Sequence, residues 1–357
     1  MTTPGTSPTW RSLTSALLRK ENLDSASVRW AMAEVMDGAV EPVSLAGFLV
    51  ALEAKGPTVT EVRALADEMV AHARTFTAPT GAVDIVGTGG DGANTVNIST
   101  MASVVIAASG LPVVKHGNRA ASSKSGAADC LEQLGVRLDL PAGDVAAMVE
   151  KVGITFCFAQ VFHPSMRFAA PARKGLGLPT VFNILGPITN PGRVEASAVG
   201  VASASMAPVI AGVFQERGAS ALVFRGRDGL DELTIADDSD VWEVRGGEIR
   251  PHVLNPSELL GLRKAPLSEL VGGSPAYNAE VARRIFDGER SAARDAVLLN
   301  AAAGITAAAG IGQEPSDGFE DRFSAAFARA EETLDSGRPA ELIETWASTS
   351  QELLAAR

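Results

Sequence analysis

Apolar residues recur every three or four positions along the first seventy-odd residues, which is the spacing of helices that bury one face. Asp24 can cap one such helix, and Ser44 can begin another. Thr60 begins the last of four. Because no strand pattern interrupts these stretches, the sequence predicts a small all-helical domain, which we bound at residues 1–78.

After residue 78 the pattern changes to short apolar runs that alternate with helical stretches. The predicted strands cover residues 83–86, 112–114, 154–158, 196–201 and 221–224. A hairpin is predicted over residues 241–253, and helices return from Ala276 onward. Strands that alternate with helices indicate an α/β fold with a mostly parallel central sheet flanked by helices. We expect this second domain to span residues 79–357, with a stretch at about 171–186 returning to the helical domain.

Composition and charge narrow the class of protein. The chain has 357 residues, 46% apolar and 20% charged, which fits a globular protein of two domains. Its formal net charge is −11 and only 5% of its residues are aromatic, so we expect no nucleic-acid partner. Two cysteines without metal-ligand spacing favour the reducing cytoplasm. The start of the sequence is not typical of a secretory signal, and no apolar run is long enough for a membrane span.

A glycine-rich loop follows the first predicted strand. Gly87, Gly89 and Gly92 satisfy the spacing of a dinucleotide-binding loop. Such a site also needs an acidic residue after the next strand, and here that strand runs into Lys115 and His116 instead. The loop is therefore not expected to bind a dinucleotide. Taken alone, it could also be a tight turn without a ligand.

The stretch between Asp91 and Asp129 contains no acidic residue, although 42 acids in 357 residues would place about four there. The basic residues in this stretch are Lys115, His116, Arg119 and Lys124. The same stretch is rich in residues with hydroxyl and amide side chains. Cations, hydroxyls and amides at helix N-termini are the groups that bind phosphate. The sequence thus predicts a receptor for several phosphate groups. The alternatives are a solvated turn for residues 115–123 and a simple helix-dipole role for Asp129.

A pair of carboxylates, Asp231 and Glu232, comes soon after the predicted strand at 221–224. Ligands of open α/β sheets bind at the carboxyl ends of the strands. Mg²⁺ is held by one or two carboxylates together with water and phosphate oxygens. The pair therefore predicts a Mg²⁺ site opposite the phosphate receptor, although surface charge is the alternative for such a pair in isolation. Asp91, inside the glycine loop, would face a hydroxyl or a metal.

Five ordered motifs resemble the signatures of the anthranilate phosphoribosyltransferase family. They are residues 84–91 (DIVGTGGD), 97–100 (NIST), 115–126 (KHGNRAASSKSG), 181–191 (VFNILGPITNP) and 228–232 (DGLDE). The resemblance covers nearly the whole chain and implies the nucleoside phosphorylase-like fold. It also implies Mg²⁺-dependent transfer of the 5-phosphoribosyl group of 5-phosphoribosyl 1-pyrophosphate (PRPP) to the amine of anthranilate, in tryptophan biosynthesis.

The resemblance carries roles over to individual positions. The residues implied to hold PRPP are Gly87, Gly90, Asp91, Thr95, Asn97, Ile98, Ser99, Thr100, Lys115, His116, Gly117, Asn118, Arg119, Ala120, Ala121, Ser122, Ser123 and Ala127. Ser99, Asp231 and Glu232 are implied as ligands of Mg²⁺. Gly87, Asn118 and Arg173 are implied to contact anthranilate, with Arg173 at its carboxylate. Members of the family are typically homodimers joined through the helical domain, so we expect the same here.

Three positions depart from the family pattern. Ala127 stands where many members have a Ser, and Arg225 stands where a His is common. Residues 174–179 lack the pattern that often follows Arg173. Two rival functions are a pyrimidine nucleoside phosphorylase and a non-enzymatic homologue that binds nucleic acid. The Lys-x-Ser-Gly-Arg segment of the first is missing, and the acidic charge opposes the second.

Overall fold

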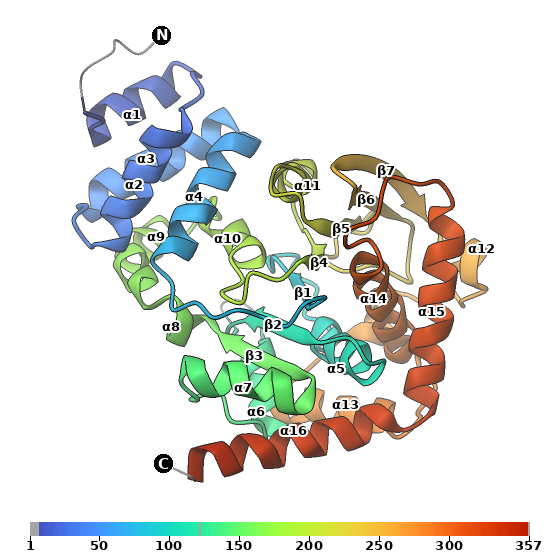
Figure 1. Cartoon of the computed structure of the whole chain (residues 1–357). Coiled ribbons are helices and arrows are strands. Elements are labelled where there is room, and N and C mark those ends of the chain that lie inside the picture. The colour runs from blue at the N-terminus through green and yellow to red at the C-terminus, as the bar shows by residue number, and fades with distance from the viewer. Residues whose placement is uncertain (1–6, 121–122, 356–357) are drawn as a thin grey trace.

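Four helices fold the N-terminal part of the chain into a bundle, as the apolar spacing predicted (Figure 1). The computed structural model describes residues 7–120 and 123–355. The bundle helices are α1 (Trp10–Leu18), α2 (Ser25–Met36), α3 (Pro42–Lys55) and α4 (Val59–Ala71). The predicted boundary at residue 78 lies in the extended crossing from this bundle to the sheet, and it stays a prediction.

Two of the predicted helix starts are wrong by a few residues. The Asp24 side chain does cap α2, accepting a hydrogen bond from the Ser27 amide at 2.8 Å. Ser44 lies inside α3, because Pro42 is pre-set for a first helical turn. Thr60 lies inside α4, because Thr58 and Glu61 form a capping box. In both helices the residue that sets the start, Pro42 or Thr58, lies two residues before the predicted one.

The chain returns to the bundle after the third strand. The returning elements are η1 (Pro164–Ala169), α9 (Ala170–Leu176), α10 (Phe182–Leu185) and η2 (Gly186–Ile188). The first three pack against α2, α3 and α4, so the packing starts earlier than the predicted residue 171, and η2 packs against α11 and β2. Arg173 therefore comes from the same side of the molecule as the bundle (Figure 1).

A seven-stranded sheet has the order β3-β2-β1-β4-β5-β6-β7. Its strands are β1 (Val83–Gly87), β2 (Val113–Gly117), β3 (Ile154–Phe158), β4 (Ala196–Gly200), β5 (Ser220–Gly226), β6 (Ser239–Arg245) and β7 (Glu248–Leu254). The first five are parallel, and the predicted hairpin adds β6 and β7 antiparallel at one edge. The mostly parallel α/β prediction is confirmed. One detail differs: Lys115 and His116 lie within β2, whereas the sequence placed them in a loop after it.

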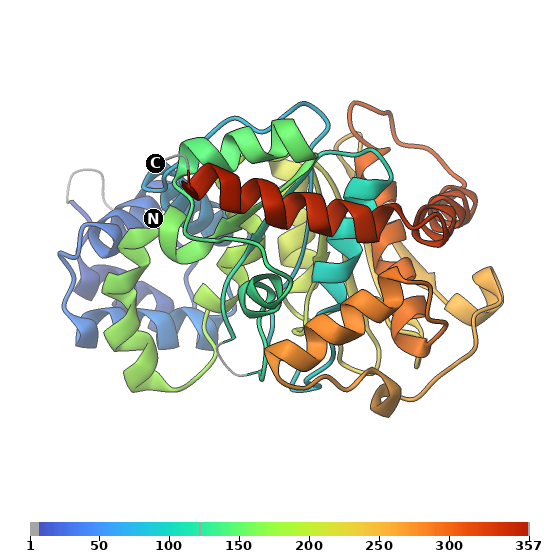
Figure 2. The same ribbon diagram turned by 90° about the horizontal axis from the view of Figure 1, so that it is seen from below.

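Helices cover both faces of the sheet. They are α5 (Ile98–Ala108), α6 (Ala127–Gln133), α7 (Ala142–Val152), α8 (Ala159–Phe162), α11 (Ala207–Glu216), α12 (Pro256–Leu260), η3 (Leu267–Leu270), α13 (Pro275–Phe286), α14 (Ala292–Ala308), α15 (Phe319–Asp335) and α16 (Arg338–Ala355). The last helix, α16, runs along the side of the molecule and packs on α5 and α7 (Figure 2). Within the described ranges, no helix is both long and apolar enough to cross a membrane.

Two apolar clusters form the interior. One lies between the sheet and the helices α5 and α14. The other contains the core of the helical bundle and continues through Leu185 and Ile188 to Val199 and Val223 on the opposite face of the sheet. The bundle therefore shares its apolar core with one face of the sheet, which the periodicity of the separate helices did not reveal. This shared packing holds the bundle against that face of the sheet.

Candidate active site

Two glycines allow the Asp231 segment to cross the ends of the central strands. Gly87 ends β1, Gly200 ends β4, and the two are paired in register. A Cβ on Gly87 would lie 2.2 Å from the Asp231 carboxylate oxygen Oδ2. A Cβ on Gly200 would lie 1.7 Å from the Asp231 carbonyl oxygen. Only glycine fits at these ends, so the strands and the carboxylate segment form one closely packed unit.

Three carboxylates, those of Asp91, Asp231 and Glu232, gather at this edge. Asp231 accepts a hydrogen bond from the Gly89 amide at 2.6 Å, and both Asp231 and Glu232 are only 8% exposed. Burial, together with the nearby Asp91, raises the pKa of Asp231 to about 7. Burial and then Asp231 raise the pKa of Glu232 well above its usual range. Buried acids that repel one another are stabilised by a cation.

The donor set at this edge fits Mg²⁺. The Glu232 carboxylate accepts a hydrogen bond from the Ser99 amide, which brings the predicted ligands Ser99, Asp231 and Glu232 to one place. Among the described residues, no group of three or more His, Cys, Asp or Glu side chains could hold a metal by itself. Mg²⁺ usually takes one or two carboxylates and completes its octahedron with water and substrate phosphates. The cluster thus fits a metal that arrives with a phosphorylated substrate.

Lys115 lies buried beneath the carboxylates. Its side chain is 1% exposed, and Nζ donates to the Ile85 carbonyl at 2.5 Å and to Ser99 Oγ at 3.4 Å. Burial lowers the pKa of Lys115, while the negative charges of Asp84 and then Glu232 act in the opposite direction. Lys115 is therefore held between two acids. It stands where the sequence predicted a cation, but inside the sheet.

Asp84 and Asn190 support this cation, and the sequence reasoning assigned neither of them a role. Asp84 accepts hydrogen bonds from the His116 amide at 3.1 Å and from Asn190 Nδ2 at 2.8 Å. Burial raises the pKa of Asp84 to about 6. Asn190 also donates to the Val114 carbonyl at 2.7 Å. An acidic residue inside a short apolar strand was the available signal, because a buried acid needs partners.

Most side chains of the predicted residues between Thr95 and Thr100 are buried or already hydrogen-bonded, which leaves mainly their backbone for a ligand. Thr95 pairs with Val271 in an isolated bridge. Asn97 is occupied: its Oδ1 accepts hydrogen bonds from Ser125 and from Asn278, a partner on α13 that the sequence did not suggest. Ile98 points into the apolar interior, and Thr100 is buried. What this segment offers a ligand is therefore mainly the N-terminal turn of α5.

His116 and Arg119 are not free cations. His116 is buried and donates from Nδ1 to the Gly186 carbonyl at 2.9 Å. Burial, reinforced by His163, lowers the pKa of His116 to about 3, so the ring is neutral. Arg119 is bound to Asp129 at 3.0 Å and to Glu132 at 2.5 Å. Among the described residues of the predicted basic set, Lys115 interacts with the carboxylate pair, through Glu232.

The Asp129 side chain holds the two described ends of the loop between β2 and α6. Asp129 accepts hydrogen bonds from the Ala120 and Gly126 amides at 3.0 and 2.9 Å, so it fixes the loop as well as lying in the first turn of α6. Gly117 ends β2, Asn118 is exposed, and Ser123 is exposed. Ala127 is the first residue of α6. The predicted residues Ala121 and Ser122 lie outside the described residues.

Arg173 lies on α9, on the bundle side of the site. Its guanidinium is 5.7 Å above the ring of Phe182, and burial lowers its pKa. In the described part of the chain, no carboxylate pairs with Arg173, and no hydrogen bond joins it to Gly87 or Asn118. A half-buried guanidinium without a charged partner is suited to bind the carboxylate of a ligand.

Comparisons with known proteins match this architecture throughout. Residues 79–340 match a family described as "Glycosyl transferase family, a/b domain", and residues 11–73 match its "helical bundle domain". The chain is 53% identical over 343 residues to anthranilate phosphoribosyltransferase of Arthrobacter sp. (strain FB24), covering 96% of each protein. The chain belongs to the anthranilate phosphoribosyltransferase family. The corresponding protein of Thermobifida fusca (strain YX) is 50% identical over 343 residues, or 96% of this chain and 97% of the relative.

Solved structures of anthranilate phosphoribosyltransferases share the fold. The crystal structure from Thermus thermophilus has a TM-score of 0.86 and 41% identity, over 95% of this chain and 99% of that one. The Saccharomyces cerevisiae protein in complex with PRPP and Mg has a TM-score of 0.85 and 27% identity, over 96% and 98%. The same yeast protein has also been solved with 4-fluoroanthranilate. These matches confirm the family that the five motifs predicted.

Of the three departures from the anthranilate phosphoribosyltransferase pattern, Arg225 has a local contact that explains it. Arg225 donates from Nε to the Ala202 carbonyl at 2.8 Å, so it ties β5 to the segment after β4. Asp228, in the same motif as the metal pair, accepts a hydrogen bond from Thr234 at 2.6 Å and shapes the turn. Residues 174–179 lie at the end of α9 and after it, mostly exposed.

Proposed function

We propose that this chain transfers the 5-phosphoribosyl group of PRPP to the amine of anthranilate. The products are N-(5-phosphoribosyl)anthranilate and pyrophosphate, the second step of tryptophan biosynthesis from chorismate. The observation that carries this function is the buried carboxylate pair Asp231 and Glu232, held beside Lys115 at the carboxyl edge of the sheet. That arrangement occurs in a chain about half identical to anthranilate phosphoribosyltransferases over nearly its full length.

The chemistry explains why these residue types are needed. The bond between the ribose C1 and the pyrophosphate oxygen breaks with its electron pair on the oxygen, and the amine lone pair forms the new C1–N bond. The nitrogen then loses one proton, to the released pyrophosphate or to water. Ser99, Asp231 and Glu232 would hold Mg²⁺, which would stabilise the negative charge of the leaving pyrophosphate. Lys115 adds a fixed positive charge, and the amides of the 87–91 loop and the first turn of α5 donate hydrogen bonds to phosphate oxygens.

No side chain is expected to bond covalently to the ribose. The amine of anthranilate is neutral at pH 7, so the enzyme has to orient it more than activate it. We assign its carboxylate to Arg173, with Asn118 and Gly87 completing the acceptor site. The support is that Arg173 is half-buried and has no acidic partner in the described ranges. Isolation of a ribosylated peptide during turnover would contradict the direct transfer.

The reaction is tested with purified protein, Mg²⁺, PRPP and anthranilate, by following the loss of anthranilate fluorescence. We expect turnover only when all components are present. Arg173→Gln should raise KM for anthranilate about 30-fold, because a charge-assisted hydrogen bond is worth about 2 kcal/mol, and should leave KM for PRPP nearly unchanged. Lys174→Gln, which changes the adjacent exposed cation, is the matched control. Equal effects of both variants would argue against Arg173 at the acceptor.

A homodimer joined through the helical bundle is part of the proposal. The side chains of Leu18, Val43 and Val50 are 70%, 79% and 44% exposed on α1 and α3, and apolar exposure of this kind favours an interface. We expect Val43→Glu combined with Val50→Glu to convert the dimer to a monomer in light scattering at micromolar concentration. Val253→Glu, at an exposed position of β7, is the control. A dimeric mass for the double variant would exclude this interface.

Location and other partners follow from the same features. We infer a cytoplasmic location, because both cysteines, Cys130 and Cys157, are buried free thiols. A nucleic-acid partner is not expected, since the net charge is −11 and Arg119 is already paired with acids. The nucleoside phosphorylase alternative has no observation in its favour.

A further inference from the structure

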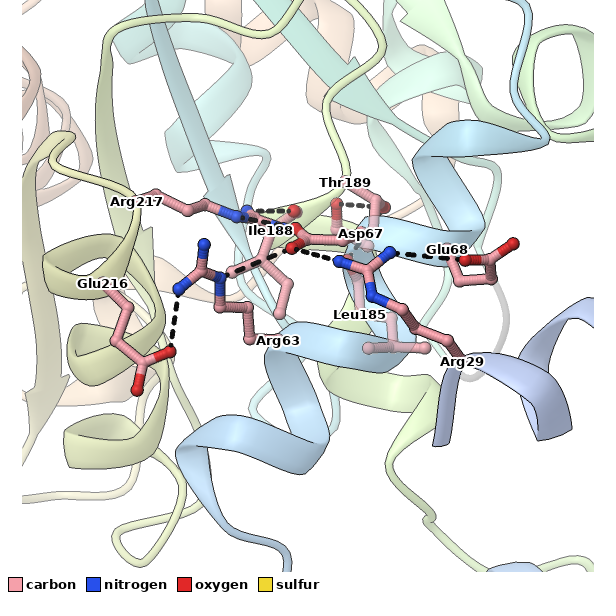
Figure 3. Close-up of polar contacts among 10 residues, drawn as sticks. Arg29, Arg63, Asp67, Glu68, Leu185, Ile188, Thr189, Glu216 and Arg217 are labelled. Atoms are coloured by element: carbon pink, nitrogen blue, oxygen red, sulfur yellow. Dashed lines mark hydrogen bonds and ion pairs between the residues drawn. The ribbon is translucent and has the colours of Figure 1, made fainter. Parts of the chain in front are cut away.

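One carboxylate joins the helical bundle to the α/β domain (Figure 3). Asp67, on α4, accepts hydrogen bonds from Arg217 Nη2 and Nε at 2.6 and 3.1 Å. Its other oxygen accepts from Arg29 of α2 at 3.1 Å and from Arg63 of α4 at 3.4 Å. Arg217 directly follows α11, which packs on the sheet. Asp67 and Arg217 therefore form one of the contacts that cross between the two parts of the molecule, beside the pair Arg63 and Glu216.

The same guanidinium also holds the segment that returns from the bundle. The third nitrogen of Arg217, Nη1, donates to the Ile188 carbonyl at 2.7 Å. Ile188 ends η2, and Gly186 at the start of η2 accepts the hydrogen bond from His116 of β2. This short turn is thus held from two sides, by Arg217 after α11 and by β2, the strand that carries Lys115.

That turn leads directly to the proposed acceptor residue. Helix α10 immediately precedes η2, and its first residue, Phe182, is buried below the Arg173 guanidinium. A shift of η2 would therefore move the ring on which Arg173 rests. The distance between Arg173 and the carboxylate cluster then depends on the position of the Arg217 guanidinium. Asp67 fixes that position through its two hydrogen bonds.

A cavity interrupts the packing between the two parts on this side. A cavity of about 770 Å³ lies between them, lined by Asp67 and Val70 of α4, by Arg217 and by Ile188, together with the amino ends of β4 and β5. Close packing occurs elsewhere, at Gly212 of α11, where a Cβ would lie 2.6 Å from Val59 Cγ2. The bundle thus packs tightly on α11 at Val59 and Gly212, whereas Asp67 and Arg217 form a polar bridge at the edge of the cavity.

We propose that the Asp67–Arg217 pair is a positioning device for the acceptor site: it sets the place of Arg173 through η2 and α10. The inference rests on the proposed function. Neither residue touches the carboxylate cluster in the described contacts. The pair therefore acts on anthranilate binding and leaves PRPP and Mg²⁺ binding alone.

The test compares Asp67→Asn and Arg217→Lys with wild type. Asparagine keeps the shape but loses the charge, and lysine keeps the charge but cannot reach Asp67 and Ile188 together. We expect each to raise KM for anthranilate about tenfold, less than the loss of Arg173 itself because Arg173 is displaced and not removed, with KM for PRPP unchanged. Arg63→Gln is the matched control, because Arg63 contacts Asp67 and Glu216 but not Ile188. It should leave both KM values unchanged.

A second measurement does not depend on turnover. Amide hydrogen exchange should accelerate over residues 182–189 in Asp67→Asn and Arg217→Lys and stay unchanged in the core of α14. Asp67→Glu, which keeps the carboxylate, should restore the wild-type KM for anthranilate. Unchanged KM and exchange in both variants, or an equal loss of PRPP binding, would overturn the positioning role. A wild-type protein without any turnover would instead overturn the proposed function.

Discussion

Replacing Asp231 by Asn together with Glu232 by Gln will remove Mg²⁺-dependent turnover and leave the fold intact. The two amides keep the shape of the acids, and the Gly89 amide can still donate to the Asn oxygen. What disappears is the negative charge that holds the cation for the departing pyrophosphate. Because that charge stabilisation acts mainly in the transition state, we expect kcat to fall by about three orders of magnitude or more.

The thermal stability of this double variant gives a second measurement of the same site. In the folded protein, burial raises the pKa of both acids, so ionising them costs the metal-free fold free energy. The free energy of unfolding of the metal-free protein therefore falls as the pH rises through the raised pKa values of Asp231 and Glu232. At pH 8 the amide variant should therefore melt no lower than the metal-free wild type, and Mg²⁺ with PRPP should no longer raise its melting temperature.

A control with the same change of charge separates the site from general electrostatics. Asp317→Asn with Glu320→Gln neutralises two exposed acids near the start of α15. That variant should retain wild-type turnover. Turnover by the Asp231→Asn, Glu232→Gln variant within tenfold of wild type would exclude these residues as the metal ligands.

Replacing Gly200 by Ala will damage both stability and activity. The added Cβ would lie 1.7 Å from the Asp231 carbonyl oxygen and 2.4 Å from its carbonyl carbon. Both are backbone atoms, so no side-chain rotation relieves the overlap. The Asp231 segment or β4 has to move, which costs about 3 kcal/mol or more by analogy with overpacked cores. A shift of that segment displaces the carboxylates, so we expect at least about a hundredfold loss of kcat.

The comparison variant for this prediction is Gly143→Ala. Gly143 lies in α7, it is exposed, and nothing lies within 4 Å of a Cβ built there. Alanine is the better helix former by about 1 kcal/mol, so this variant should be slightly stabilised and fully active. Thermal unfolding and the fluorescence assay measure both effects. A Gly200→Ala protein with wild-type melting and turnover would show that the segment does not pack on β4 as described.

Several features of the site were predictable because they depend on local sequence. The period of three to four indicated the bundle helices, and short apolar runs indicated the parallel strands. The carboxyl ends of parallel strands meet at one edge, so the glycine loop and the pair Asp231 and Glu232 could be placed together in advance. The absence of acids between Asp91 and Asp129 predicted a phosphate-facing stretch from the sequence alone.

Other features depend on contacts between residues far apart in the sequence. The sequence treated Lys115, His116 and Arg119 alike, as cations or potential cations of one loop. In the structure Lys115 is buried between Asp84 and Glu232, His116 is neutral against Gly186, and Arg119 is paired with Asp129. Burial and partners decide the charge and direction of each side chain, and neither can be obtained from spacing alone.

The sequence by itself determined the fold class, the five motifs and the acids and cations available for the chemistry. These follow from periodicity and residue type, which act over a few neighbours. Only the tertiary structure decided which cation faces the carboxylates and why Gly87 and Gly200 must be glycine. It also decided that Asp67 and Arg217 bridge the bundle to the sheet. Each of these depends on two segments packing within a few ångströms of each other, and that distance is set by the whole fold.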